Sequence, residues 1–269
     1  MPLNHLLYQI INIFLQLNNF KATTSTSTTT LAITAPSDPK FLRANERNLK
    51  SASDPTIYIG YDKSQIRTLF LEKNQIASLE ANQFAQMTNL ESLWFFGNRI
   101  TTLEPNWTNG LKNLVYIDFN NNQLSTLGNS DFNGLPKLQG LSLCNNGFKF
   151  LDAANSPFAS LPKLNTLDLT GNPLRASLTG ASFKNLNNLK QLWLRFCSIT
   201  VLDENAFKNP FCQPNKSNTL IMMAGNPVVN SAQLLDNTCY TYKLYDGTPP
   251  TTSIPLTSQL TFSFFVFIT

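Results

Sequence analysis

A hydrophobic register that recurs about every 24 residues, within the range typical of solenoid repeats, is the feature that most constrains how this chain folds. Stacked at that period, the sequence divides into seven units, which begin at Ile66, Leu90, Leu114, Leu138, Leu164, Leu189 and Asn218. The spacing between successive starts is nearly constant except before the last unit, where it is longer. A unit of this length cannot bury its apolar side alone, so neighbouring units must stack and share one core.

Each unit carries the order LxxLxLxxNxL, as in Leu138, Leu141, Leu143, Asn146 and Phe148. The central LxL alternation predicts a short strand with one buried face. The ninth residue turns the chain inward. Asn suits that turn because its amide both donates to and accepts from backbone groups of its own and the neighbouring loop. The column of ninth residues is Asn74, Asn98, Asn122, Asn146, Asn172, Cys197 and Asn226.

A second column, in the later part of each unit, holds aromatic side chains that we expect to stack into a buried spine: Phe84, Trp107, Phe132, Phe158, Phe183 and Phe207. The two columns together resemble the leucine-rich-repeat family. The 24-residue form with its Phe is similar to the repeats of extracellular animal proteins such as Toll-like receptor ectodomains and small leucine-rich proteoglycans. In this family Cys is an accepted replacement for the Asn, so Cys197 is interpreted as structural.

The resemblance covers residues 66–228 and implies an α/β repeat protein. The expected fold is a right-handed, horseshoe-shaped solenoid with a parallel β-sheet on its concave face. Its convex side is expected to be mostly loop or short 3-10 helix. Family members usually carry a cysteine-rich cap at each end, but no cysteine precedes Ile66. We therefore expect residues 56–65, in which Ile57 and Ile59 alternate, to cap the first repeat as a bare strand.

The N-terminal segments have two expected parts. Residues 1–22 contain an apolar stretch, Leu6 to Leu15, that favours a signal peptide; a buried or disordered leader is the alternative, because the stretch is too short to span a bilayer. Residues 23–55 are expected to form a Thr-rich linker and then a short basic helix that begins at Asp38-Pro39.

After the repeats we expect a C-terminal cap over residues 229–245 and a tail over residues 246–269. The tail ends in LTFSFFVFIT, preceded by a spacer and by small residues, a layout that fits a lipid-anchor (GPI) signal. The alternatives are a segment that packs on the last repeat and an incomplete sequence.

The positions of the four cysteines in the sequence divide them into two pairs. Cys144 and Cys197 lie two strands apart, about 10 Å, which exceeds the reach of about 7 Å for a disulfide. Cys212 and Cys239 both fall near the C-terminal cap. The resemblance implies that they form one disulfide bond, a simpler form of the family's C-terminal cysteine cap.

Two N-glycosylation sequons begin at Asn106 and Asn215, on loops away from the strands. They mildly favour a secreted or cell-surface protein.

The candidate binding residues lie on the concave face, at positions between and just after the strand leucines. We expect exposed aromatic side chains toward the two ends of this face and solvated aspartates between them. The set is Phe70, Trp94, Phe96, Tyr116, Asp118, Asp168, Trp193, Arg195 and Phe196. Aromatic residues and Arg are the types enriched at the centres of protein interfaces. Coverage by other parts of the same chain is the alternative for both aromatic clusters.

These observations favour a non-enzymatic recognition protein, extracellular and receptor-like or matrix-like, that binds a protein or a glycan. An intracellular scaffold of the same fold is the alternative. The net charge of +4 is spread without a dense Lys/Arg stripe, which argues against nucleic acid as a partner. The single histidine, His5, and the lack of a CxxC pair argue against a metal site, and no motif calls for a cofactor.

Overall fold

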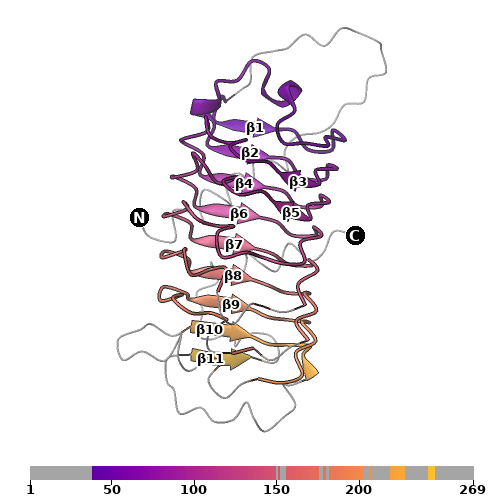
Figure 1. Cartoon of the computed structure of the whole chain (residues 1–269), viewed down its shortest axis with the longest axis vertical. Coiled ribbons are helices and arrows are strands. Elements are labelled where there is room, and N and C mark those ends of the chain that lie inside the picture. The colour runs from indigo at the N-terminus through magenta and orange to yellow at the C-terminus, as the bar shows by residue number, and fades with distance from the viewer. Residues whose placement is uncertain are drawn as a thin grey trace. The chain divides into compact units, whose positions relative to one another are not determined.

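The computed structural model describes residues 38–149, 151, 156–175, 178–179, 182–202, 206–207, 219–227 and 242–245. All of them belong to one compact unit, Thr34–Gly247. Within these residues nine strands form one parallel sheet in the order β1-β2-β4-β6-β7-β8-β9-β10-β11, one rung per repeat (Figure 1). Their bounds are β1 Phe41–Arg43, β2 Thr68–Phe70, β4 Ser92–Trp94, β6 Tyr116–Asp118, β7 Gly140–Ser142, β8 Thr166–Asp168, β9 Gln191–Trp193, β10 Thr219–Met222 and β11 Tyr242–Tyr245.

The strands that begin the seven predicted repeats stand in one register, which confirms the leucine-rich-repeat solenoid. Leu69 pairs with Leu93, and Leu93 with Ile117, and the same pairing continues along the sheet. These central strand residues point into the core and are at most 2% exposed: Leu42, Leu69, Leu93, Ile117, Leu141, Leu167, Leu192 and Ile221. Each such side chain contributes about 2 kcal/mol of burial free energy.

The asparagine column forms a buried ladder between successive loops. The Nδ2 group of Asn98 donates to the carbonyl of Phe95 in its own loop (2.9 Å) and to that of Leu71 in the preceding repeat (2.8 Å). Its Oδ1 accepts the backbone N–H of Ile76, also in the preceding repeat (3.1 Å). One side chain thus satisfies three buried backbone groups that no strand pairing reaches.

The Cys197 side chain reproduces the hydrogen bonds that a ladder asparagine donates, but not the one that it accepts. Its thiol donates to the carbonyl of Leu169 in the preceding repeat (3.1 Å) and to that of Arg195 in its own loop (3.4 Å). The N–H of Leu174, which an Asn at 197 would accept, bonds locally to the Asn172 carbonyl instead (2.8 Å). The structural interpretation of Cys197 therefore fits its contacts.

The residue before each ladder position adopts a left-handed backbone conformation. The positions are Glu46 (φ 57°), Lys73 (53°), Gly97 (70°), Asn121 (54°), Asn145 (51°), Gly171 (72°), Phe196 (53°) and Gly225 (76°). Gly and Asn reach this region at little cost, whereas a bulky side chain there is a genuine outlier. Glu46, Lys73 and Phe196 are the members of this column that are neither Gly nor Asn, and Phe196 is the bulkiest of them.

The convex side is packed around the aromatic spine, and its strands in the described residues are very short. The spine residues Phe84, Trp107, Phe132, Phe158, Phe183 and Phe207 are all buried, as expected. Phe84 meets Trp107 edge to face with ring centroids 6.3 Å apart, and Phe132 stacks on Phe158 at 6.4 Å. Two two-residue strands, β3 Ser78–Leu79 and β5 Thr102–Leu103, pair beside the main sheet.

The N-terminal cap differs from the expected one. No helix begins at Asp38-Pro39; instead β1 pairs in register with β2, because Leu42, Ala44 and Leu49 occupy the core positions of a further, degenerate repeat. The strand expected over residues 56–65 is replaced by two 3-10 helices, η1 Pro55–Tyr58 and η2 Lys63–Gln65. Asp54 and Asp62 start them by accepting N–H bonds two residues ahead.

Candidate ligand-binding face

The strands place alternate side chains outward, and the register fixes which of them are neighbours. We call this surface the sheet face. Its central row consists of the last residue of each strand from β1 to β9: Arg43, Phe70, Trp94, Asp118, Ser142, Asp168 and Trp193. A second row follows one core residue later: Asn45, Glu72, Phe96, Asn120, Cys144, Thr170 and Arg195. The two rows contain all the sequence-predicted binding residues except Tyr116 and Phe196, which flank them.

Aromatic side chains form a continuous stack at the N-terminal end of the sheet face. The guanidinium of Arg43 lies 4.4 Å from the ring centroid of Phe70. Phe70 stacks on Trp94 at 5.8 Å, and Trp94 meets Tyr116 at 4.9 Å. Phe70 is 3% exposed and Trp94 8% exposed, which corrects the expectation that these rings face solvent. One reason is that rings from neighbouring rungs cover one another; Phe96, in the second row, is half-buried.

Tyr116 leans across the adjacent strand rather than standing upright. A Cβ atom on Gly140 would lie 2.7 Å from Cδ2 of Tyr116, so the missing side chain is what lets the ring lie there. Burial and the nearby carboxylates of Asp118, Asp168 and Glu72 raise the pKa of Tyr116, and Ser142, one rung further along the central row, acts against this rise. Gly140 was not predicted as a site residue; a glycine at an outward strand position is the signal that marks it.

Three carboxylates, Glu72, Asp118 and Asp168, lie along the middle of the sheet face. Asp118 is fully buried and Asp168 is 7% exposed, which corrects the expectation of ordinary solvated acids. The Oδ1 of Asp118 accepts the N–H of Asn120 (2.7 Å), and that of Asp168 accepts the N–H of Thr170 (2.9 Å). The Oδ2 atom of Asp118 is buried and has no hydrogen-bond partner among the described residues.

Burial raises the pKa of Asp118 to about 7. The N–H of Asn120 acts against this rise, and the nearby carboxylates of Glu72 and Asp168 add to it. Burial also raises the pKa of Asp168 and of Glu72. For these two groups, however, hydrogen bonds and a nearby arginine act in the opposite direction, from Thr170 and Arg195 for Asp168 and from Asn45 and Arg43 for Glu72.

An amide network connects the acids to the next rungs. Oδ1 of Asn120 accepts the Ser142 hydroxyl (2.7 Å) and the N–H of Cys144 (2.7 Å). Burial raises the pKa of the Cys144 thiol, and the carboxylates of Asp168 and Asp118 raise it further. Ser142 is thus bonded to an amide rather than to a base, and Cys144 is held as a neutral thiol, so neither is an activated nucleophile.

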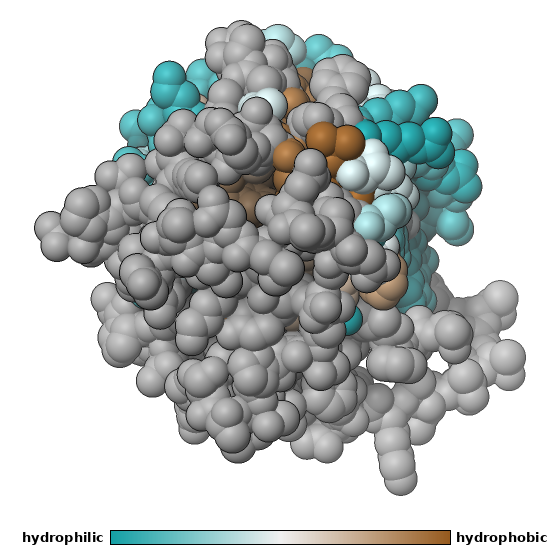
Figure 2. Space-filling view, turned by 90° about the horizontal axis from the view of Figure 1, so that it is seen from below, coloured by the Kyte–Doolittle hydropathy of each residue, from teal (hydrophilic) through white to brown (hydrophobic). Residues whose placement is uncertain are grey.

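The C-terminal end of the sheet face carries Trp193, Arg195 and Phe196. Phe196 is 61% exposed, as expected, while Trp193 and Arg195 are half-buried. The Phe196 ring leans over Gly225, where a Cβ would lie 2.2 Å from its Cδ1 atom. Viewed from the end at which β11 lies, hydrophobic side chains gather near the centre, beside a hydrophilic flank (Figure 2). An apolar ring is thus presented to solvent from a strained backbone position.

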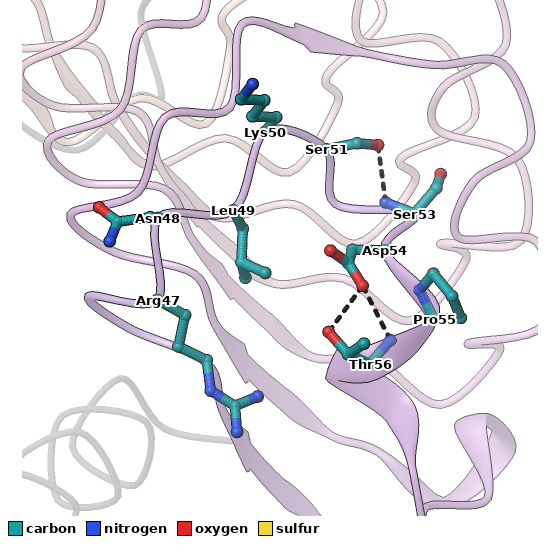
Figure 3. A pocket seen from close by; sticks show the side chains of 9 residues that line it. All are labelled: Arg47, Asn48, Leu49, Lys50, Ser51, Ser53, Asp54, Pro55 and Thr56. Carbon is teal, nitrogen blue, oxygen red and sulfur yellow. Dashed lines mark hydrogen bonds between the residues drawn. The ribbon is translucent and has the colours of Figure 1, made fainter.

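A separate cavity of about 810 Å³ lies in the N-terminal cap, lined by residues 47–51 and 53–56 (Figure 3). Its polar groups are largely used within the cap. Asp54 accepts the N–H and the hydroxyl of Thr56, at 2.9 and 2.6 Å, and the Ser51 hydroxyl oxygen accepts the N–H of Ser53 at 3.0 Å. All lining residues come from one short stretch of chain, so the cavity is a feature of the cap loop.

The remaining predicted sites are placed as follows. Cys144 and Cys197 are unpaired, as their separation requires. Asn106 is exposed on its loop, and the hydroxyl of Thr108 in the same sequon donates to the Asn133 carbonyl at 2.6 Å. Cys212, Cys239, Asn215, the leader and the tail from residue 246 lie outside the described residues.

Membrane-spanning and metal-binding features were sought in the described residues. None of their helices combines the length and the apolar character that crossing a membrane requires. They also contain no cluster of three or more His, Cys, Asp or Glu side chains placed to hold a metal ion.

The comparison with protein families agrees with the geometry of the repeats. The family described as leucine rich repeat matches residues 96–148, which span the ladder from Asn98 to Asn146. Residues 96–148 thus match leucine-rich repeats in sequence, and the described residues have the fold of such repeats. Among solved structures, the crystal structure of human 5T4 (Wnt-activated inhibitory factor 1, trophoblast glycoprotein) is similar at 25% identity and a TM-score of 0.49, covering 70% of this chain and 77% of that one. A comparison with curated proteins gave no match. Leucine-rich repeats are characteristically protein-interaction domains, and their strand-lined face is the surface described above.

Proposed function

We propose that this protein is a non-enzymatic recognition protein that binds a protein ligand on its sheet face. The observation that carries the proposal is the central row, in which Arg43, Phe70, Trp94 and Trp193 flank Asp118 and Asp168 on the rungs of one sheet. Trp, Tyr and Arg dominate the binding energy of protein interfaces. The rows are accessible at the half-buried Trp193 and Arg195 and at the neighbouring Phe196, which is 61% exposed, and the parallel sheet holds them rigidly, so little ordering is required on binding.

The contacts of the two aspartates support recognition rather than catalysis. Asp118 and Asp168 are two rungs apart, about 10 Å at the usual strand spacing, near the upper limit for a pair of inverting glycosidase carboxylates. Each accepts a backbone N–H from its own loop. Neither holds a nucleophile or a water-activating partner in the contacts described above, so the two acids are recognition groups in this proposal.

We place the protein outside the cell, as a receptor-like or matrix-like molecule. The exposed Asn106 sequon, the apolar segment near the N-terminus and the 24-residue repeat with its Phe column support this location. Expression of the full chain in cultured eukaryotic cells tests it. We expect recovery from the secretory route and a mobility shift on enzymatic deglycosylation that is reduced by Asn106→Gln. An unshifted intracellular product would instead support the intracellular scaffold.

Ligand binding is tested by screening the purified full chain against an array of secreted proteins and ectodomains. Phe96→Asp and Phe196→Asp each place a charge on the sheet face, and we expect either to weaken capture of a ligand at least about tenfold. Val201→Asp is the matched control, because Val201 is similarly exposed (47%) but lies off the sheet face. A ligand that both sheet-face variants bind normally and the control does not would overturn the proposal. Binding to a parallel glycan array alone would replace protein by glycan as the ligand class.

A further inference from the structure

A second surface, beside the sheet face, is formed by the segments that lead from the aromatic spine into the strands. These segments are residues 108–115, 133–139, 159–165 and 184–190, which enter β6, β7, β8 and β9 at the left edge of the sheet in Figure 1. Their ionisable side chains are all lysines, and all are exposed: Lys112, Lys137, Lys163, Lys184 and Lys190. We call this surface the lysine flank.

The register of the solenoid brings these lysines into line, although a full repeat separates most of them in the sequence. The N–H of Gln139 bonds to the Val115 carbonyl, and that of Asn165 to the Gln139 carbonyl, both at 2.9 Å. The N–H of Lys190 bonds in turn to the Asn165 carbonyl at 2.7 Å. The segments are therefore consecutive rungs about 5 Å apart, and the row from Lys112 to Lys190 extends over about 15 Å.

The positive charge of the lysine flank is not neutralised by the described residues. The ion pairs found among them lie elsewhere: Arg67–Glu91 and Lys73–Glu46. The ammonium of Lys137 donates to Oδ1 of Asn113 in the preceding rung at 2.6 Å, which positions the group but leaves its charge. Like charges on neighbouring rungs repel one another, so an anion that lies along the row would relieve an unfavourable interaction.

The opposite flank, where the chain leaves the ladder and returns to the spine, has no such bias. Its described residues carry both signs, with Arg99 and Glu104 in one repeat, Asp131 in the next and Lys149 in the one after. The row of lysines is therefore a property of one side of the solenoid, not a uniform consequence of the net charge of +4.

We propose that the lysine flank binds a linear sulfated polysaccharide that runs along the axis of the solenoid. Charges that recur on successive rungs match an anion whose charges recur along a chain, whereas a compact anion reaches few of them. Exposed amide side chains on the same segments supply donors and acceptors for sugar hydroxyls: Asn109, Asn133, Asn187 and Asn188. This site is separate from the sheet face and does not depend on the ligand proposed there.

Nucleic acid fits the lysine flank less well than a sulfated polysaccharide. Proteins that bind single strands stack the bases on aromatic side chains, and proteins that read duplexes use arginine to contact guanine. The segments of the lysine flank contain neither an arginine nor an aromatic residue. Their ammonium groups are compact point charges, which suit sulfate groups but carry no means of recognising a base.

Surface plasmon resonance of the full chain over immobilised heparin measures the proposed binding, and desulfated heparin is the matched probe. We expect binding to heparin at low salt and none to desulfated heparin. The affinity for heparin should fall at least about tenfold when the salt concentration is raised about fourfold, because each ion pair formed releases counterions. Absence of heparin binding, or tighter binding to single-stranded DNA of similar length, would overturn the proposal. These comparisons require no variant.

Substitutions then locate the site. The flank variant combines Lys112→Gln, Lys137→Gln and Lys163→Gln. The control variant combines Lys50→Gln, Lys73→Gln and Lys149→Gln, at exposed lysines outside the flank, so that the net charge changes equally. The loss of one exposed ion pair weakens binding about threefold, so we expect the flank variant to bind heparin about thirtyfold more weakly and the control variant less than about threefold more weakly.

Equal losses in the two variants would show that heparin follows the net charge and not this surface, and would overturn the proposal. Because the substituted side chains are exposed, we expect both variants to unfold in urea as the wild type does. The sheet-face variants separate this site from the proposed function. Heparin binding that is lost with Phe96→Asp but retained by the flank variant would assign the polysaccharide to the sheet face and overturn the lysine flank. Heparin binding that survives Phe96→Asp but not the flank variant would support the lysine flank, whatever ligand the sheet face binds.

Discussion

Asp118 is expected to make the folded protein less stable at neutral pH than it would be with a neutral side chain there. Its pKa in the folded protein is about 7, against an ordinary value of 3.8. Between these two pH values the unfolded chain has released the proton while the folded protein still holds it. The folded state therefore binds more protons, and its stability falls as the pH rises from 3.8 to about 7. Below the ordinary value the carboxyl is neutral in both states and the penalty is absent.

The size of this loss of stability follows from the difference between the ordinary and the folded pKa of Asp118. At about 1.4 kcal/mol for each pH unit, an interval from 3.8 to about 7 corresponds to about 4 kcal/mol. Asp118→Asn removes the ionisation and keeps the shape. We expect this variant to be more stable than the wild type by about 4 kcal/mol at pH 7.5 and by about 1 kcal/mol at pH 4.5. Glu72 and Asp168, the carboxylates that act on Asp118, are present in both proteins, so their own titration largely cancels in the comparison.

Urea unfolding followed by circular dichroism at the two pH values measures this difference. Asp62→Asn is an internal control, because hydrogen bonds from the side chain and the N–H of Ser64 lower the pKa of Asp62. The stability that the Asp62 carboxylate contributes is essentially complete above the ordinary pKa of Asp, so the difference between that variant and the wild type should be nearly the same at both pH values, whereas Asp118→Asn gains stability over the wild type between them. If Asp118→Asn destabilised the protein equally at both pH values, the carboxylate would be serving the fold, and the reasoning from its unsatisfied oxygen would be refuted.

Three further perturbations test other parts of the structure. Asn122→Ala leaves the N–H of Ile100 and three backbone carbonyls without their ladder partner, and we expect a loss of about 3 kcal/mol in urea unfolding. Gly140→Ala introduces a Cβ 2.7 Å from the Tyr116 ring, so the ring must move from its place beside Trp94, and we expect a loss of about 1 kcal/mol in urea unfolding. Phe196→Gly relieves the left-handed strain and should raise the unfolding free energy by about 1 kcal/mol while reducing ligand capture; a loss of stability would show that the ring is part of the core.

The repeats and their register were predictable from the sequence because they are set by local chemistry that recurs. A buried leucine at alternate strand positions and an asparagine at the turn leave the same pattern in every unit, and the ladder of Asn74 to Asn226 follows that pattern. The repeat that contains β1 escaped detection because its pattern is degenerate. Ala44 stands in place of the strand leucine, and Arg47 in place of the asparagine. Its core contacts become visible only when β2 is placed beside it.

The residues that make up the sheet face were predictable, but their exposure to solvent and the ionisation of their acids were not. The sequence places Phe70, Trp94 and Asp118 at outward positions, and the register confirms this. Whether an outward ring is exposed depends on rings one rung away, which lie a full repeat distant in the chain. The same holds for Tyr116, which lies flat because the next rung carries Gly140. Ionisation depends on still more neighbours, so the raised pKa of Asp118 has no signature within a single repeat.

The solenoid architecture explains how the chain tolerates two unfavourable features on one surface. In a repeat protein each unit contacts only its neighbours, and stability is approximately a sum of unit and interface contributions. Around Asp118 the core residues Ile117 and Phe119 and the ladder residue Asn122 are fully packed and bonded, so the penalty of one carboxylate is confined to a unit that is otherwise well stabilised. Phe196 likewise follows the buried Leu194 and precedes the bonded Cys197. Strain and an unsatisfied acceptor that persist within a well-bonded frame are typical of functional positions. Both features lie on the sheet face, the surface proposed above for ligand binding.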